Sequence, residues 1–331
     1  MKIGAFTLLF GEKPIAETLD YLCSLGVAAV EFGTGAYVRA ATFPVEELLS
    51  SDAKVRWLKD AIATRNLEIS ALSCHGNPLH PNQRIAKSHH ADFVNTCKLA
   101  RRLGVKQVNT LSGCPGSDPG AELPSWIVSS LFPEDFAKAW EWQWKEWVIP
   151  YWREAAQIAN DNGVRVGIEM APNCVVFNVS TLLRLRRAVG ENIGANLDPS
   201  HLFWQGMDIG AVIRALGDAI FHFHAKDSAV NPYVAAVDGV LDPKPLTDEF
   251  NRSWIFRTVG YGHDELAWNN IISALRTVGY DSVLSIEHED SLMEGDEGLR
   301  KAISFLQRSL IQAPPGRAYW AEESRRNLAE E

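Results

Sequence analysis

The chain has 331 residues, of which 46% are hydrophobic and 22% are charged, a globular composition that excludes extended disorder. Its formal net charge of −9 argues against nucleic-acid binding, because nucleic-acid-binding proteins present a basic face. No apolar run approaches about 18 residues, so we expect no membrane span. Five cysteines without a C-x-x-C spacing indicate reduced thiols, as expected of a cytoplasmic protein.

Short β-rich runs alternate with longer helical patterns along the chain. The predicted strands span residues 2–9, 28–33, 68–74, 105–111, 165–170, 193–198, 220–225 and 282–287. The predicted helices span residues 14–25, 54–66, 84–103, 134–162, 178–190, 208–217, 265–279 and 296–311. A glycine often closes a helix before the next strand, as at Gly26, Gly104, Gly163 and Gly279. Eight such units predict an α/β fold, a single-domain (β/α)8 TIM barrel over residues 1–312.

Two connections are longer than the others, and both leave the carboxyl ends of predicted strands. One follows the fourth strand, over residues 113–133, and the other follows the seventh strand, over residues 229–264. Long loops at that end of a barrel strand usually serve binding. Residues 313–331, with Tyr319 and Trp320, are predicted to form a C-terminal arm that lies across this domain or a partner.

Six of the eleven tryptophans fall between Trp126 and Trp152. Trp140, Trp144 and Trp147 recur at helical spacing, which predicts a helix packed on the barrel or on another subunit. Trp126 lies in the loop before this helix. It is the best candidate in the stretch for an aromatic wall against a sugar or an aglycone.

Four predicted strands in the second half of the chain each end at a residue that can bind a metal ion. These residues are Glu169, Asp198, His224 and Glu287. The first three are separated in sequence by about the length of one βα unit, so they belong to consecutive strands. The carboxyl ends of barrel strands meet at one face of the barrel. Carboxylate oxygens and an imidazole nitrogen suit Mn²⁺, with Mg²⁺, Co²⁺ and Zn²⁺ as alternatives. We therefore predict a site for one divalent metal ion.

The alternation of side chains along a strand tests this prediction. The residue two positions before each ligand also points into the barrel, where Val, Ile or Leu is usual. Here those residues are Gly167, Asn196, His222 and Ser285. We predict a small or polar layer that orients the ligands by hydrogen bonds, and the alternative is a set of individually satisfied buried polar residues.

Glu169 and Glu287 are the predicted acid/base pair. Two carboxylates on opposite sides of a bound ligand can move a proton on either face of a carbon next to a carbonyl. The metal ion would polarise the carbonyl oxygen and stabilise the enediolate. The alternative is a pair of strand-end carboxylates in salt bridges.

Six further residues are candidates for substrate contacts. His201 follows Asp198 after a proline turn, and Lys226 shares the inward direction of His224, although a salt bridge with Asp227 is an alternative for Lys226. For Glu31 and His75, which lie at the ends of predicted strands, the alternative is a structural role. The candidates are Glu31, His75, Trp126, His201, Lys226 and Arg257.

At these residues the chain resembles the xylose-isomerase-like TIM-barrel superfamily, which includes sugar phosphate isomerases and epimerases. The resemblance covers nearly the whole chain and is carried by IEMAP at Glu169, NLDPSH at Asp198 and His201, HFHAKD at His224, and FRTVGYG with SIEHED at Glu287. It implies that the four strand-end residues bind one divalent metal ion, often Mn²⁺. It also implies that Glu169 and Glu287 exchange protons at a ketose carbon and that His201 contacts the substrate.

The expected activity is that of a metal-dependent sugar isomerase or epimerase in carbohydrate metabolism. The ketose 3-epimerase branch has an arginine six residues after the histidine ligand, whereas Val230 stands there in this chain and Arg257 is the candidate replacement. The alternative within the superfamily is a lyase that performs β-elimination on a keto-inositol or a 3-keto-glycoside, as in C-glycoside deglycosidases.

Two other classes of protein remain as alternatives from the sequence. A multi-metal AP endonuclease shares the barrel type, but it would need more ligands and a basic groove. A sugar-binding protein without catalysis would keep the same fold. We expect a small sugar or glycoside as substrate and a homo-oligomer, with a second small subunit as an open alternative.

Overall fold

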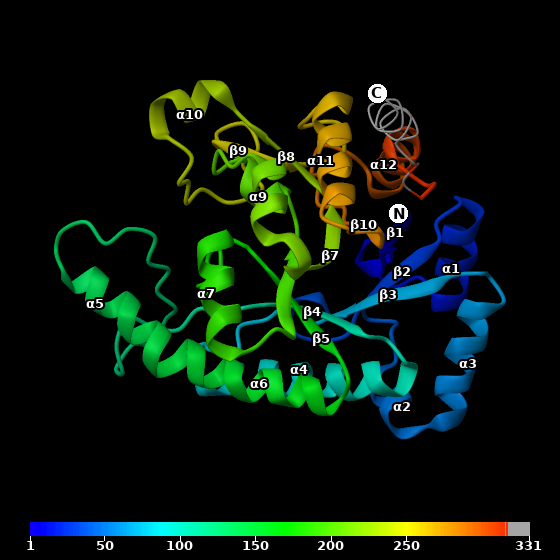
Figure 1. The fold of residues 1–331 in the computed structure, drawn as a ribbon, viewed down its shortest axis with the longest axis horizontal. Coiled ribbons are helices and arrows are strands. Elements are labelled where there is room, and N and C mark those ends of the chain that lie inside the picture. Colours follow the sequence, from blue (N-terminus) through cyan, green and yellow to red (C-terminus); the bar gives the residue numbers. More distant parts are fainter. Residues whose placement is uncertain (315, 317–331) are drawn as a thin grey trace, which may run out of the picture.

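Eight parallel strands close into a barrel in the computed structural model of the chain, which describes residues 1–314 and residue 316 (Figure 1). Around the barrel the strands follow the order β1-β10-β7-β6-β5-β4-β3-β2. They are β1 (Lys2–Phe6), β2 (Ala29–Gly33), β3 (Glu68–Ser73), β4 (Gln107–Leu111), β5 (Arg165–Glu169), β6 (Ile193–Leu197), β7 (Ile220–Ala225) and β10 (Val283–Ile286). The predicted (β/α)8 TIM barrel is therefore confirmed.

The first predicted strand is too long. The sequence predicts a strand over residues 2–9, but β1 ends at Phe6 and a 3-10 helix, η1 (Thr7–Phe10), follows it. The side chain of Thr7 turns to donate a hydrogen bond to the carbonyl oxygen of Glu31, 2.9 Å away. This bond and the turn at Gly11, whose φ is 55°, lead the chain out of the barrel.

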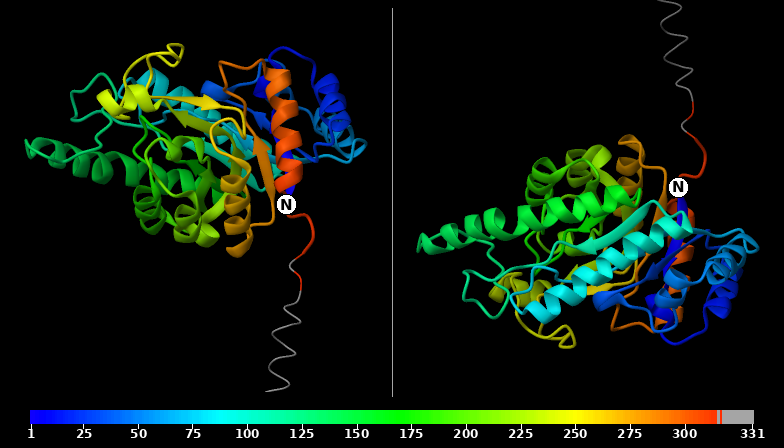
Figure 2. Two further views of the ribbon diagram at one scale, coloured as in Figure 1. Left: turned by 90° about the horizontal axis from the view of Figure 1, so that it is seen from above. Right: turned by 90° about the horizontal axis from the view of Figure 1, so that it is seen from below.

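Helices surround the barrel, and most of them lie where the sequence predicts them (Figures 1 and 2). The long ones, apart from the tryptophan-rich segment, are α1 (Ile15–Ser24), α3 (Asp52–Ala63), α4 (Gln83–Leu103), α7 (Val179–Val189), α9 (Ile209–Leu216), α11 (Glu265–Thr277) and α12 (Gly295–Ser309). Short helices that the sequence does not predict are η2 (Ala36–Val38), α2 (Val45–Ser50), α8 (Ser200–Phe203) and η4 (Gly217–Ala219). Gly104 ends α4 in the predicted left-handed conformation, with φ of 82°.

One long helical segment carries most of the tryptophan-rich stretch and extends beyond the barrel (Figure 2). It comprises α5 (Asp135–Trp142), a π-helical turn, η3 (Gln143–Val148), and α6 (Ile149–Asp161), which confirms the predicted helix. Trp144 and Trp152 are fully buried in the main hydrophobic core, whereas α5 buries none of its residues. Packing on the barrel thus explains the inner half of the segment.

The connection from β7 to α11 is an insertion with its own structure. β8 (Asp227–Val230) pairs antiparallel with β9 (Trp254–Arg257), and α10 (Pro232–Asp238) lies between them in the chain. The sequence predicts the long connection but not this hairpin. Two strands of four residues are too short to show a clear alternation among so many Pro, Asp and Asn residues.

Asp227 ties this insertion to the barrel. Its buried carboxylate accepts hydrogen bonds from the backbone N–H groups of Gly260, Gly262 and His263 and from the indole of Trp268. A ring nitrogen of His263 lies 2.7 Å from the other oxygen. Because these donors converge on one buried charge, the chain between β9 and α11 has a defined path.

The predicted C-terminal arm lies almost wholly outside the described residues, and Tyr319 and Trp320 are not among them. At the other end of the chain the amino group of Met1 forms an ion pair of 2.5 Å with Asp281, just before β10. None of the helices in the described part of the chain has both the length and the apolar composition needed to cross a membrane.

We expect the substitution Asp227→Asn to lower the free energy of unfolding by about 2–4 kcal/mol, because it removes the buried charge on which the donors converge. Denaturant unfolding followed by circular dichroism measures this. Asp218→Asn is the control, since that side chain is 93% exposed and its loss should cost about 0.5 kcal/mol or less. Equal stability of the two variants would contradict the anchoring role of Asp227.

Candidate metal centre

Four side chains from consecutive strands of the barrel meet at its carboxyl end. Glu169 ends β5, Asp198 follows β6, His224 lies in β7 and Glu287 follows β10. Their ligand atoms lie within 4.8 Å of one another, close enough for the four residues to hold one metal ion. The side chain of Glu287 is 10% exposed and those of the other three are almost fully buried. The cluster therefore meets solvent mainly beside Glu287.

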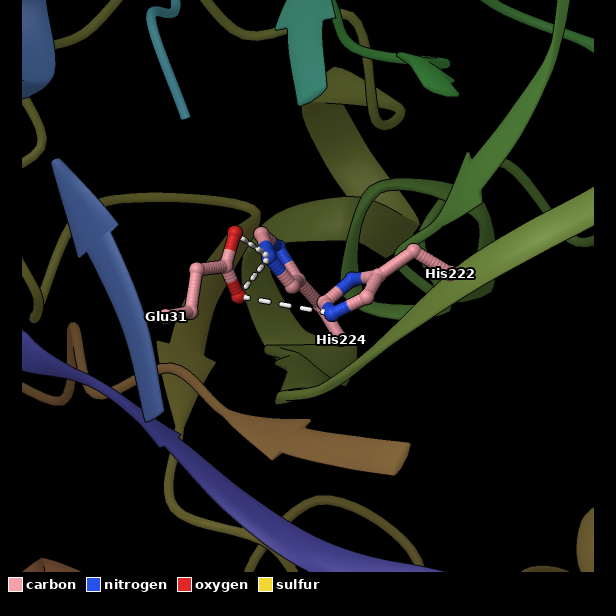
Figure 3. Close-up of side chains that lie close together, drawn as sticks. All are labelled: Glu31, His222 and His224. Carbon is pink, nitrogen blue, oxygen red and sulfur yellow. Dashed lines mark hydrogen bonds and ion pairs between the residues drawn. The ribbon is translucent and has the colours of Figure 1, made fainter. Parts of the chain in front are cut away.

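The surroundings of Glu31 show that this side chain is ionised. Its carboxylate accepts hydrogen bonds from Ser73, Asn109 and Ser285 and lies 3.1 Å from Nε2 of His224. Burial acts to raise the pKa of Glu31, but His224 and a second imidazole hold this pKa well below its usual range. Figure 3 shows the Glu31 carboxylate pointing toward both imidazoles.

The ionised Glu31 determines which ring nitrogen of His224 carries the hydrogen that points to Glu31, and the other nitrogen faces the cluster. A carboxylate can only accept hydrogen bonds, so Nε2 of His224 carries the hydrogen. In a neutral imidazole Nδ1 is then unprotonated, and Nδ1 is the nitrogen that faces the strand-end carboxylates. A carboxylate behind a histidine is the arrangement by which proteins commonly orient a metal-binding imidazole.

A row of hydrogen bonds crosses the barrel and ends at Glu31. Arg165 Nε donates to Gln107 Oε1 at 2.9 Å, Gln107 Nε2 donates to Asn109 Oδ1 at 2.7 Å, and Asn109 Nδ2 donates to Glu31 Oε1 at 3.0 Å. A guanidinium can only donate, so it fixes the orientation of both amides. Gly167 leaves room for them, because a Cβ there would lie 2.6 Å from Gln107 Nε2.

The predicted polar layer beneath the ligands is present in the structure. Asn196 Nδ2 donates to Glu169 Oε2 at 2.7 Å, which leaves Asn196 Oδ1 to accept from His222 Nδ1 at 2.9 Å. Burial lowers the pKa of His222 to about 4, so this imidazole is neutral at pH 7. Ser285 donates to Glu31 at 2.6 Å. The layer is connected by hydrogen bonds, as the alternation of side chains predicts.

The cluster is suited to a cation. His224 Nδ1 lies 3.0 Å from a Glu169 oxygen and 3.1 Å from a Glu287 oxygen. Burial acts to lower the pKa of His224, but Glu31, Glu287 and Glu169 raise it well above its usual value, so these carboxylates favour a positive charge at this point, either a proton or a metal ion. Asp198 Oδ2 is buried and lies 3.1 Å from Nζ of Lys226 and 3.4 Å from Nε2 of His201. With His224 bound to an ion as a neutral imidazole, the three carboxylates and the ammonium of Lys226 would together carry two negative charges. This balance and these donor types fit a divalent metal ion.

Two further imidazoles hold Glu169. His75 Nε2 lies 3.0 Å from Glu169 Oε2, and His201 Nε2 lies 2.9 Å from Glu169 Oε1. Burial acts to raise the pKa of Glu169, but His75, His201 and His224 together hold this pKa well below its usual range. The structure thus brings the predicted residues His75 and His201 into direct contact with the cluster.

Lys226 also belongs to the cluster. Its Nζ lies 2.7 Å from Glu287, 3.1 Å from Asp198 and 2.8 Å from Glu289. Burial acts to lower the pKa of Lys226, but these carboxylates raise it well above its usual value. The alternative of a salt bridge to Asp227 is wrong, because that carboxylate turns to the insertion instead.

The structure places the other predicted substrate contacts elsewhere. Glu31 lies under the cluster, fully buried and surrounded by hydrogen-bond donors, so it supports His224 instead of facing a substrate. Arg257 Nε donates to Asp290 at 3.1 Å, so this guanidinium has a carboxylate partner outside the cluster. Trp126 lies in the wall of a neighbouring cavity.

Sequence reasoning missed Gln107 and Asn109, although a signal for them exists. They are two positions apart in β4, and both are buried. The alternation of side chains, which we used only for the four strands that carry the metal-ligand candidates, would have found them if it had also been applied to this strand. Phe256 was also missed. Its ring lies 5.4 Å from that of His201 and 4.6 Å from Nζ of Lys226, but it belongs to the hairpin that the sequence does not predict.

Comparisons with known families agree with the fold. A family model described as "Xylose isomerase-like TIM barrel" matches residues 19–309. A relative from Bacillus subtilis (strain 168), "Uncharacterized protein YfiH", is 37% identical over 314 residues, which cover 94% of this chain and 100% of that protein.

Two solved structures illustrate the fold similarity. The probable 3-DHS dehydratase AsbF, involved in petrobactin synthesis in Bacillus anthracis, superposes with a TM-score of 0.66 at 17% identity, over 93% of this chain and 99% of that chain. D-psicose 3-epimerase from Clostridium cellulolyticum H10 superposes with a TM-score of 0.59 at 16% identity, over 93% of this chain and 98% of that chain. At these identities the similarity shows a shared fold.

We expect Glu31→Gln to weaken the binding of Co²⁺ by about 10–100-fold, because an amide cannot hold the Nε2 hydrogen of His224 as an ionised carboxylate does. Calorimetric titration measures the affinity, and the ¹⁵N shifts of labelled histidine report the protonated nitrogen. Ser285→Ala keeps the carboxylate and removes only one donor to it, so its loss should be smaller. Unchanged Co²⁺ affinity in Glu31→Gln would rule out this supporting role.

Proposed function

The chain belongs to the xylose isomerase-like TIM barrel family, and we propose that it is a divalent-metal-dependent sugar isomerase or epimerase. The observation that carries this proposal is the buried cluster of Glu169, Asp198, His224 and Glu287 at the carboxyl end of the barrel. The four residues are proposed to hold one metal ion, with Mn²⁺ as the expected ion. A keto sugar is the proposed substrate.

The two glutamates are proposed to move the proton. β6 and β7 separate β5 from β10 in the barrel, so Glu169 and Glu287 approach Nδ1 of His224 from two sides. A carbon held between them can lose a proton to one carboxylate and regain one from the other. A divalent ion bound there would supply polarisation of the neighbouring carbonyl.

Neighbouring side chains would set the orientation and charge of the pair. His75 and His201 bind the two oxygens of Glu169, which limits the rotation of that carboxylate. Lys226 lies 2.7 Å from Glu287 and would stabilise negative charge that develops on a substrate oxygen nearby. The low exposure of the site keeps water away and strengthens these interactions.

A lyase of the same family is the second candidate. The observation that favours it is the pairing of Arg257 with Asp290, because Arg257 is the candidate replacement for the epimerase arginine and already has a carboxylate partner outside the cluster. Elimination begins with the same proton abstraction and then needs an acid for the leaving group. His75 and His201 each have a buried Nδ1 without a partner among the described residues and lie beside Glu169.

We expect Glu169→Gln and Glu287→Gln each to lower kcat by at least about 100-fold, because an amide can neither accept nor return the proton. The measurement is exchange of a substrate α-proton with solvent deuterium, across ketoses, keto-inositols and 3-keto-glycosides, with the metal content of each variant determined in parallel. Glu297→Gln, on the exposed side of α12, is the control. Wild-type exchange in a metal-loaded variant would remove that glutamate from the acid/base pair.

Removal of the metal ion should abolish the exchange and lower the melting temperature. An ion that binds only the folded state adds about 2.7 kcal/mol when its concentration is one hundred times its Kd. Dialysis against a chelator followed by calorimetry with and without Mn²⁺ measures both effects. Full exchange in protein shown to be metal-free would contradict the proposed mechanism.

A further inference from the structure

A cavity of about 510 Å³ lies beside the metal centre, between the insertion and the barrel. Its walls come from the loops that follow β4, β5 and β6 and from the segment between β8 and the end of β9, all at the carboxyl end of the barrel. A volume of this size lies in the range of ordinary ligand sites. The aromatic and leucine side chains that line it are Trp126, Trp204, Leu241, Leu246, Trp254 and Phe256.

Flat aromatic rings dominate this cavity. The rings of Trp204 and Trp254 are stacked, with centroids 4.6 Å apart and an angle of 4° between their planes. Phe256 stands at 70° to Trp254, and Trp126 also lines the cavity. Aromatic rings bind a further planar group by offset stacking or by edge-to-face contact.

The cavity and the metal centre share one wall. Phe256 lines the cavity, and its ring also contacts two residues of the metal centre. Lys226 Nζ lies 4.6 Å from the ring centroid, and the ring of His201 meets it edge-on at 5.4 Å. A molecule with its polar part at the cluster can therefore extend past Phe256 into the aromatic cavity.

The charged residues of the cavity wall are occupied by their own loop. Asp242 accepts hydrogen bonds from the backbone of Lys244 and Ser253, and Lys244 Nζ lies 3.3 Å from Asp242. The guanidinium of Arg252 donates to the carbonyl oxygen of Trp254 at 3.0 Å and lies over its ring. The wall is preformed, and each of these charged groups already has partners within the loop before a ligand arrives. An uncharged ligand group fits this wall best.

We propose that this cavity binds an uncharged planar aromatic group that is part of the substrate, so that the substrate is an aryl conjugate of a sugar instead of a free sugar. This inference rests on the proposed function for the polar part of the molecule. The stacked tryptophans and Phe256 hold the aromatic group, while the cluster binds the sugar. Leu241 and Leu246, both exposed, form the rim through which the group enters.

The test compares phenyl β-D-glucopyranoside with methyl β-D-glucopyranoside, which differ only in the aromatic group. We expect the phenyl glucoside to bind the Mn²⁺-loaded protein about tenfold more tightly in calorimetric titration, which corresponds to about 1.4 kcal/mol. Trp126→Ala removes one wall, and Leu246→Trp fills the rim without truncating the core. Both variants should reduce the preference to about twofold or less.

Trp57→Ala is the matched control, because it removes an exposed tryptophan on α3 and should keep the tenfold preference. Equal affinity of the two glucosides in the wild-type protein would overturn the inference, and so would a preference that survives both cavity variants. If the wild-type protein shows no preference for the phenyl glucoside but does exchange a substrate α-proton with solvent, only this inference is refuted. A phenyl preference without any metal-dependent exchange would refute the proposed function alone.

Discussion

The hydrogen bond between His224 and Glu31 is the interaction on which the rest of the site depends. It leaves Nδ1 of the imidazole facing Glu169 and Glu287, a position that a cation stabilises. Glu31 in turn is held ionised by Ser73, Asn109 and Ser285, fully away from water. A buried carboxylate without such donors would be neutral and could not fix the imidazole.

Much of this arrangement could be predicted from the sequence because strands repeat every two residues. The spacing from Glu169 to Glu287 predicted ligands from consecutive strands, and the alternation rule predicted the layer that contains Asn196 and Ser285. The contacts of Glu31 could not be predicted, since its partners come from strands far apart in the chain and only closure of the barrel brings them together. The same applies to Lys226, whose partners follow β6 and β10 and meet it only when the barrel closes.

The insertion shows where local patterns stop being informative. Its hairpin strands have four residues each, and the partners that stabilise them are tertiary, such as the amides that converge on Asp227. Yet this segment supplies Phe256, the residue that joins the metal centre to the aromatic cavity. The barrel strands thus determine the chemistry that the site can perform, whereas the inserted segment shapes the space that a substrate can fill.

The row from Arg165 to Glu31 has a consequence for engineering this protein. Residues at the amino end of a barrel are usually treated as stability determinants that can be changed without regard to the active face. Here the guanidinium of Arg165 fixes the amides that lead to Glu31, the carboxylate that orients His224 in the candidate metal centre. A library that varies Arg165, Gln107 or Gly167 to raise thermal stability would therefore also sample metal affinity, and the two properties cannot be optimised independently at these positions.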